Sequence, residues 1–253
     1  MLELRSWNEM AEWFDSRQGD AGDRWHRELI YPCVKQMAGN VAGLRTLDVA
    51  CGNGSLTRWL KRQGALVTGT DATLELLQHA RRRESESPLG IEYIHCDAAR
   101  LEFAATAEFD LVMCTMALMD MPDAESPIRE IARVMKPDGR AVICISHPCF
   151  DVPENSDWIV ETGDDGKTSV WRKVRRYREI FSAPIGWSNK DFYTLTYHRP
   201  LHWYFRALHS AGLCVTSFEE PSPTATMLQE GDEAIYIQQI PVQCVMEARK
   251  WRP

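Results

Sequence analysis

A glycine turn between an apolar strand and a helix, followed by a second strand that ends on an acid, constrains the fold of this 253-residue chain most. The turn lies in TLDVACGNGSLTRWL, residues 46–60, and the second strand, LVTGTD, ends on Asp71. Gly52 and Gly54 let the backbone turn sharply and approach a ligand closely. A carboxylate at the end of the next strand can accept two hydrogen bonds from a ribose diol. Together these features predict an α/β fold that holds a nucleoside-containing cofactor.

The turn lacks the G-x-G-x-x-G form of dinucleotide-binding folds, whose third glycine allows a helix to pack closely on a strand. Leu56, Thr57 and Arg58 follow the run G-N-G-S, so the third glycine is missing. The form D-x-A-C-G-x-G, which begins at Asp48, instead resembles motif I of the class I S-adenosylmethionine-dependent methyltransferases.

Further segments resemble the same family in the same order along residues 44–147. VTGTDAT resembles the segment with the ribose-binding acid, here Asp71, and IEYIHCDAARL resembles the segment whose acid, here Asp97, holds the adenine amino group. FDLVMCTMALMDMPD resembles the fourth strand and the loop beside the cofactor's methionine end. EIARVMKPDGRAVICISHP resembles the next helix, a K-P-D-G turn and the fifth strand. Either acid alone could merely cap a helix, but their joint order and spacing favour the family.

The resemblance implies S-adenosyl-L-methionine as the cofactor and S-adenosyl-L-homocysteine as the product. In such enzymes an N-terminal helical piece closes over the cofactor, which adds Trp7 and Phe14 to the site, although simple helix packing also explains these two side chains. The expected cofactor-binding residues are Trp7, Phe14, Asp48, Ala50, Gly52, Asn53, Gly54, Asp71, Ala72, Asp97, Ala98 and Cys114.

Differences in composition and in the pattern of expected helices and strands divide the chain into four segments. We expect an N-terminal helical cap at 1–43, a cofactor-binding core at 44–147, an inserted substrate lid at 148–199, and a C-terminal helix and strands at 200–253. Alternating strands and helices predict a parallel sheet with helices on both faces. The resemblance extends this to a doubly wound, Rossmann-like sheet of seven strands, mostly parallel with an antiparallel last strand. The expected strands of the core are 45–50, 66–71, 91–96, 109–114 and 140–146.

The segment at each side of the core has its own pattern. Apolar positions on one helical face predict a first helix from Trp7 onward, and a second helix is expected at about 23–37, interrupted or started near Pro32. In the lid, residues 163–166 predict a hairpin turn between WIVE and TSVWRKVRRY. The aromatic side chains of the lid either shape a substrate pocket or form the lid's own small core.

Two histidines are candidates for a general base. His147 ends the fifth strand and His198 precedes a helix, so both could point into the crevice and accept a proton near neutral pH, or serve as structural hydrogen-bonding groups. Tyr193 is a candidate for orienting the acceptor. Arg199 could bind a carboxylate or phosphate, and Asp120 is a weaker candidate because its loop could simply cap a helix.

The acceptor of the methyl group is expected to be a small molecule, with transfer to oxygen, nitrogen or carbon left open. A net charge of −7 argues against nucleic acid as the partner. The basic run WRKVRRYR, 171–178, is either a solvated face or a patch for an anionic substrate. It is also the docking strip in a second hypothesis, an RNA or protein methyltransferase. A third hypothesis is a non-catalytic protein that binds the cofactor.

Eight scattered cysteines without a C-x-x-C pair predict a reducing environment and no metal site. No signal peptide and no apolar run of membrane-spanning length stand out, so a cytoplasmic protein without a membrane partner is expected. The expected oligomeric state is a monomer or a homodimer.

Overall fold

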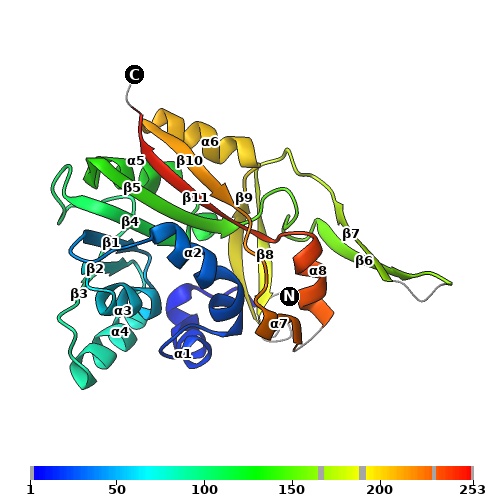
Figure 1. Ribbon diagram of the computed structural model, residues 1–253, viewed down its shortest axis with the longest axis horizontal. Coiled ribbons are helices and arrows are strands. Elements are labelled where there is room, and N and C mark those ends of the chain that lie inside the picture. Colours follow the sequence, from blue (N-terminus) through cyan, green and yellow to red (C-terminus); the bar gives the residue numbers. More distant parts are fainter. Residues whose placement is uncertain (1–2, 165–167, 188–191, 230–231, 252–253) are drawn as a thin grey trace.

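The computed structural model describes residues 3–164, 168–187, 192–229 and 232–251, which form a central sheet with helices on both faces (Figure 1). Within these residues, seven strands form one sheet in the order β10-β11-β5-β4-β1-β2-β3. The strands are β1 (Arg45–Val49), β2 (Leu66–Asp71), β3 (Glu92–His95), β4 (Phe109–Thr115), β5 (Met135–Ser146), β10 (Leu213–Glu219) and β11 (Gln243–Lys250). β1 to β5 pair in parallel, whereas β11 runs antiparallel to its neighbours β5 and β10. The predicted doubly wound sheet with an antiparallel last strand is confirmed.

Helices cover the sheet because each buries an apolar stripe against the strands. On one face, Val34, Leu60 and Leu77 belong to a single buried cluster with strand residues. On the other face, Ile131 and Leu208 pack into a second cluster. The helices that carry these residues are α2 (Tyr31–Ala38), α3 (Ser55–Arg62), α4 (Leu74–Glu86), α5 (Glu125–Val134) and α6 (Leu201–Ser210).

The chain before the sheet forms α1 (Trp7–Gln18) and then a π-helical turn, η1 (His26–Ile30), which runs directly into α2. Pro32 lies in the first turn of α2, where the missing N–H costs no hydrogen bond. The predicted second helix therefore exists and is interrupted just before Pro32, but by a π-turn rather than by a break. Such turns are rare and are often found at functional sites.

The K-P-D-G residues were expected to form a turn before the fifth strand. They instead lie inside β5. Phe109 pairs with Met135 and Leu111 pairs with Arg140, so residues 136–139 bulge out of the ladder. A Cβ on Gly139 would come within 3.0 Å of the carbonyl oxygens of Phe109 and Asp110, which explains a glycine at this point.

The segment after β5 forms two hairpins. β6 (Ser156–Thr162) and β7 (Thr168–Val174) pair antiparallel, as their sequences predicted, and project from the body (Figure 1). Gly163 and Asp164 follow β6, whereas Asp165 and Gly166 of the expected turn lie outside the described residues. The hairpin packs through Trp158 on Tyr236 of α8 (Asp232–Gln239), which follows α7 (Ala225–Gln229).

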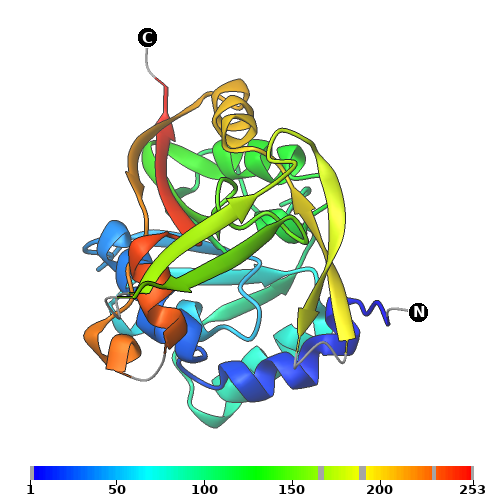
Figure 2. The same cartoon turned by 90° about the vertical axis from the view of Figure 1, so that its right-hand side faces the viewer.

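The second hairpin, β8 (Phe181–Trp187) with β9 (Phe192–His198), reaches from the sheet to α1 (Figure 2). Trp187 packs edge-on against Trp7 and Trp13, with ring centroids 5.9 and 5.7 Å apart. Leu4 forms a β-bridge with Tyr193. The hairpin and the N-terminal helix therefore meet each other across the carboxyl ends of the strands.

Candidate active site

A cavity of about 1300 Å³ lies at the carboxyl ends of the parallel strands. Its floor includes Ala50, Asp71 and Thr115, which end or follow β1, β2 and β4, and its cover includes Trp7 of α1 and Trp187 of β8. Ligands of open α/β sheets bind at this edge. The cavity exceeds the roughly 300–1000 Å³ of an ordinary small-molecule pocket, so it has room for two ligands.

The glycine turn and the acid of β2 contact each other directly. The N–H groups of Gly52 and Thr73 donate to the two carboxylate oxygens of Asp71, both over 2.8 Å. Burial raises the pKa of Asp71, and these two hydrogen bonds partly offset that rise. Ala50 and Gly52 both have positive φ angles, which bend the backbone at the cavity wall. The carboxylate is thus fixed in place at the wall of the cavity and can still accept hydrogen bonds there.

Two further polar residues of motif I are buried beside this turn. Asp48 accepts a hydrogen bond from Thr57 over 2.6 Å, and burial raises the pKa of Asp48 to about 7. Asn53 donates from its amide to the Asp15 carboxylate over 2.8 Å and to the Gly19 carbonyl over 2.9 Å. Asn53 therefore ties the end of α1 to motif I.

Ten of the twelve expected cofactor-binding residues line this one cavity. These are Trp7, Phe14, Asp48, Ala50, Gly52, Asn53, Asp71, Ala72, Asp97 and Ala98. Gly54 and Cys114 are not among the lining residues, and their direct contact with the cofactor stays a prediction. A Cβ on Gly54 would come within 2.9 Å of the Tyr93 ring, so this glycine allows packing, and the Cys114 side chain is fully buried in the core.

The three expected catalytic residues are not among the lining residues either. His147 is 2% exposed and lies 2.9 Å from Glu220, while its Nδ1 accepts from the Cys149 N–H. The Nε2 atom of His198 lies 2.8 Å from the Tyr177 carbonyl oxygen, to which it donates. Tyr193 pairs through its backbone with residues 3 and 5. The side chains of β9 alternate between its two faces, and Thr196, which lines the cavity, is on the face opposite to Tyr193. A catalytic role for these three residues stays a prediction, without support from their placement.

Polar residues that were weak candidates from the sequence, or not candidates at all, line the other half of the cavity. Asp120 ends a short 3₁₀ turn, η2 (Leu118–Asp120), after β4, and Asp151 follows β5. Burial raises the pKa of Asp120 to about 7, and a hydrogen bond with Thr196 lowers it only in part. Asp123, three residues later, supplies the helix cap that the loop was expected to make, because it accepts from two N–H groups of α5.

A histidine–aspartate pair also lines the cavity, at the π-turn. His26 Nδ1 lies 2.8 Å from Asp23 Oδ1 and 3.0 Å from the Gln18 amide nitrogen. Burial opposes ionisation of Asp23, but hydrogen bonds from His26 lower its pKa overall, so its carboxylate is charged at neutral pH. A ring proton on Nδ1 would satisfy the Asp23 carboxylate and leave Nε2 as a proton acceptor, whereas the Gln18 amide, which also donates toward Nδ1, would require a lone pair there. The sequence signal was an Asp-x-x-His spacing at the start of a helix.

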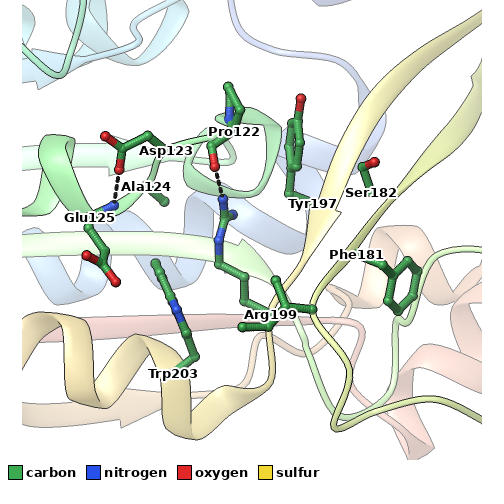
Figure 3. A pocket seen from close by; sticks show the side chains of 10 residues that line it. Pro122, Asp123, Ala124, Glu125, Phe181, Ser182, Tyr197, Arg199 and Trp203 are labelled. Carbon is green, nitrogen blue, oxygen red and sulfur yellow. Dashed lines mark hydrogen bonds between the residues drawn. The ribbon is translucent and has the colours of Figure 1, made fainter.

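Arg199, a candidate for anion binding, is fully engaged by the protein (Figure 3). Its guanidinium donates to the carbonyl oxygens of Leu118, Met121 and Pro122, over 3.3, 2.7 and 2.8 Å. It also lies over the Trp203 ring, 4.9 Å from the centroid. Arg199, Trp203 and Pro122 border a second pocket of about 390 Å³, which shares Pro122 and Asp123 with the main cavity. Arg199 thus fixes the loop that carries Asp120.

Three of the five basic side chains in the run 171–178 form ion pairs. Arg172 Nη2 lies 3.2 Å from Asp151 Oδ1, and the guanidinium stacks on Trp158 at 4.5 Å. Arg175 pairs with Asp157 over 3.5 Å and Arg176 with Glu179 over 2.8 Å. The run is therefore neither a free basic strip nor an open anion patch.

The described residues contain no group of three or more His, Cys, Asp or Glu side chains placed to hold a metal ion. In the same residues, no helix is both long and apolar enough to cross a membrane.

The fold and the cavity define an α/β protein with a nucleoside-cofactor site at the carboxyl edge of its sheet. Residues 47–143 match the family model described as a methyltransferase domain. Residues 47–143 thus form a methyltransferase domain, in agreement with the S-adenosylmethionine-dependent methyltransferase motifs read from the sequence.

Curated relatives share the core of the chain. The ubiquinone biosynthesis O-methyltransferase of Salmonella paratyphi A is 35% identical over 106 residues, 42% of this chain and 44% of the relative. The enzyme of that name from Actinobacillus pleuropneumoniae is 34% identical over 142 residues, 54% of this chain and 61% of the relative. The chain thus spans about half the length of the curated relatives it matches.

Solved structures match over more of the chain. The S-adenosylmethionine-dependent methyltransferase of Mesorhizobium loti has a TM-score of 0.71 and 25% identity, covering 87% of this chain and 97% of that one. A protein described as a putative S-adenosylmethionine-dependent methyltransferase from Listeria monocytogenes has a TM-score of 0.71 and 22% identity, covering 88% and 96%. The likeness extends beyond the core to the segments that cover the cavity.

Proposed function

We propose that the protein transfers a methyl group from S-adenosylmethionine to a small-molecule acceptor. The observation that carries the proposal is one continuous cavity that joins the motif acids to a second polar cluster around Asp120 and Asp151. A cofactor at one end would leave space for an acceptor at the other. The O-methyltransferase names of the curated relatives support a small acceptor.

The residues present fit the adenosine half of the cofactor. Asp71 is held by two backbone N–H groups, so its remaining lone pairs face the cavity and suit a ribose diol. Asp97 lines the same cavity after β3, where it would accept from the adenine amino group. When bound, S-adenosylmethionine supplies an electrophilic methyl group on a sulfonium. The chain's task is then to align an acceptor with that methyl group and to exclude water.

Water is excluded by the aromatic contact between α1 and β8. The rings of Trp7, Trp13 and Trp187 meet at 5.7–5.9 Å and line the cavity. These two elements cover the site and come from distant parts of the sequence, because α1 belongs to the N-terminal cap and β8 to the inserted lid.

His26 is placed to take the proton of a hydroxyl or amine acceptor. Asp23 orients the ring through Nδ1, which leaves the Nε2 lone pair to accept the proton as the new bond to carbon forms. His147 and His198 were the expected bases, but their ring nitrogens are engaged by Glu220 and by a carbonyl oxygen outside the lining of the cavity.

The alternative acceptors have less support. An RNA or protein methyltransferase would need a docking strip, and the basic run is largely neutralised by ion pairs.

All eight cysteines are free thiols, which suits the reducing cytoplasm in which we place the protein. The expected monomer or homodimer stays a prediction that sedimentation can check.

Transfer of radioactive methyl groups into a cell extract tests the proposal. The protein is incubated with methyl-labelled S-adenosylmethionine and extract that has been separated into small-molecule, RNA and protein fractions. We expect label in the small-molecule fraction. Label only in RNA or protein would establish the alternative, and binding of S-adenosylhomocysteine without transfer to any fraction would favour a non-catalytic protein.

A further inference from the structure

We infer that the acceptor half of the cavity binds a basic amine in its ammonium form, between the carboxyl groups of Asp120 and Asp151. This inference rests on the proposed function, because it names the substrate class for the same site. Asp120 follows β4 and Asp151 follows β5, and these strands are neighbours in the sheet. The two acids are therefore brought to one edge of the cavity, away from the acids of β2 and β3.

The two acids differ in their partners, because Asp151 is ion-paired with Arg172, whereas the partner of Asp120 is a neutral hydroxyl. Burial raises the pKa of Asp120 to about 7, and its hydrogen-bonding partner is the neutral hydroxyl of Thr196. Burial also raises the pKa of Asp151, even though Arg172 lies 3.2 Å away. The Arg172 guanidinium also donates to the Phe150 carbonyl over 2.7 Å and to Ser156 over 2.8 Å, so only part of it is available to Asp151. A ligand that brings positive charge and several N–H donors would stabilise both carboxylates.

A buried amide oxygen at the same end of the cavity also lacks a donor. Gln243 begins β11, pairs with Ser146 at the end of β5, and is 4% exposed. Its side-chain oxygen has no hydrogen-bonding partner among the described residues, although the residue lines the cavity. A buried unsatisfied acceptor costs about 1–3 kcal/mol, so a donor that came within reach of this oxygen, which is itself buried, would remove that cost.

The same region offers little to an anion. Arg172 is paired with Asp151, and Arg199 is engaged by three carbonyl oxygens. An anionic acceptor, which the basic run had suggested from sequence, would instead face two carboxylates.

Matched pairs of amines and acids test the inference by calorimetry. The protein is first saturated with S-adenosylhomocysteine and then titrated with tyramine against 4-hydroxyphenylacetate, and with tryptamine against indole-3-acetate. Each pair keeps the ring and exchanges the ammonium for a carboxylate. We expect at least one amine to bind about tenfold more tightly than its acid, a difference of about 1.4 kcal/mol. Equal or tighter binding of the acids, or no amine binding below a Kd of about 10 mM, would overturn the inference.

Variants separate the two proposals. Asp120→Asn and Asp151→Asn should each weaken amine binding about fivefold or more while the affinity for S-adenosylhomocysteine changes less than about twofold. Asp157→Asn is the control, because that exposed acid lies on β6 outside the lining. If the Asp151→Asn substitution also displaces Arg172, its ion-pair partner, the Asp120→Asn variant still tests the inference. Failure of S-adenosylhomocysteine to bind would refute the proposed function, whereas normal binding without a preference for amines would refute only this inference.

Discussion

Asn53 donates a hydrogen bond to Asp15 over 2.8 Å, and this bond joins motif I to the N-terminal helix. Asp15 is 5% exposed and also accepts from Arg83 over 2.6 Å. It further lies 3.1 Å from a ring nitrogen of His79 on α4. One carboxylate therefore holds the helix that covers the cofactor end of the cavity, so the stability of this cover should depend on pH.

Replacing Asp15 with asparagine should lower the free energy of unfolding at pH 7 by roughly 1–3 kcal/mol, because Arg83 would lose its charged partner. Burial alone would raise the pKa of Asp15, but the bonds from Arg83 and Asn53 lower it overall. The stabilisation is therefore present above the ordinary pKa of an aspartate and is lost as the pH falls through the lower folded-state pKa. Urea unfolding at pH 7 and at pH 3 measures this; a deficit that persists undiminished at the lowest pH would contradict it.

Asp120→Asn should have the opposite effect on stability. The folded-state pKa of Asp120 is about 7 because of burial, so ionisation of this group opposes folding. The cost is absent below about pH 4, grows as the pH rises and is complete above about pH 7. The variant should gain roughly 1–2 kcal/mol at pH 8 and nothing at pH 4, which thermal unfolding at both pH values checks. Destabilisation of the variant at pH 8 would contradict this, because it would mean that another group stabilises the charged Asp120 carboxylate.

Trp187→Ala should loosen the contact between the lid and α1. The ring touches both Trp7 and Trp13, and aromatic pairs of this kind contribute roughly 0.5–1.5 kcal/mol each. Faster amide hydrogen exchange in α1 and weaker binding of S-adenosylhomocysteine are the expected results. Trp251→Ala is the matched control, since that tryptophan is 57% exposed. Unchanged exchange in α1 would show that the lid does not hold the helix.

His26→Gln should lower turnover by about 10²–10⁴-fold if His26 accepts the proton, with cofactor affinity nearly unchanged. Asp23→Asn should also lower turnover, because the Asp23 carboxylate orients the ring of His26. His147→Gln and His198→Gln serve as comparisons, since neither residue lines the cavity. Large losses of turnover in these two variants with normal rates for His26→Gln would restore the assignment made from sequence.

Local sequence signals predicted the sheet, its order of motifs and most of the cofactor half of the site. Gly52 and Asp71 could be recognised because a turn and a strand end carry their own signals. The acceptor half could not be recognised in this way, because Asp120, Asp151 and Gln243 meet only through strand pairing. The contact of His147 with Glu220 could not be predicted for the same reason, because the two residues lie 73 positions apart in the sequence.

The affinity of Asp71→Ala for S-adenosylhomocysteine tests the central claim most directly. The carboxylate is fixed by the N–H groups of Gly52 and Thr73, so its removal deletes two hydrogen bonds to the ribose while leaving the cavity open. Calorimetry should show at least a tenfold loss, about 1.4 kcal/mol, and no loss in the exposed control Asp164→Ala. Unchanged affinity in a folded Asp71→Ala protein would contradict the assignment of this cavity to the cofactor.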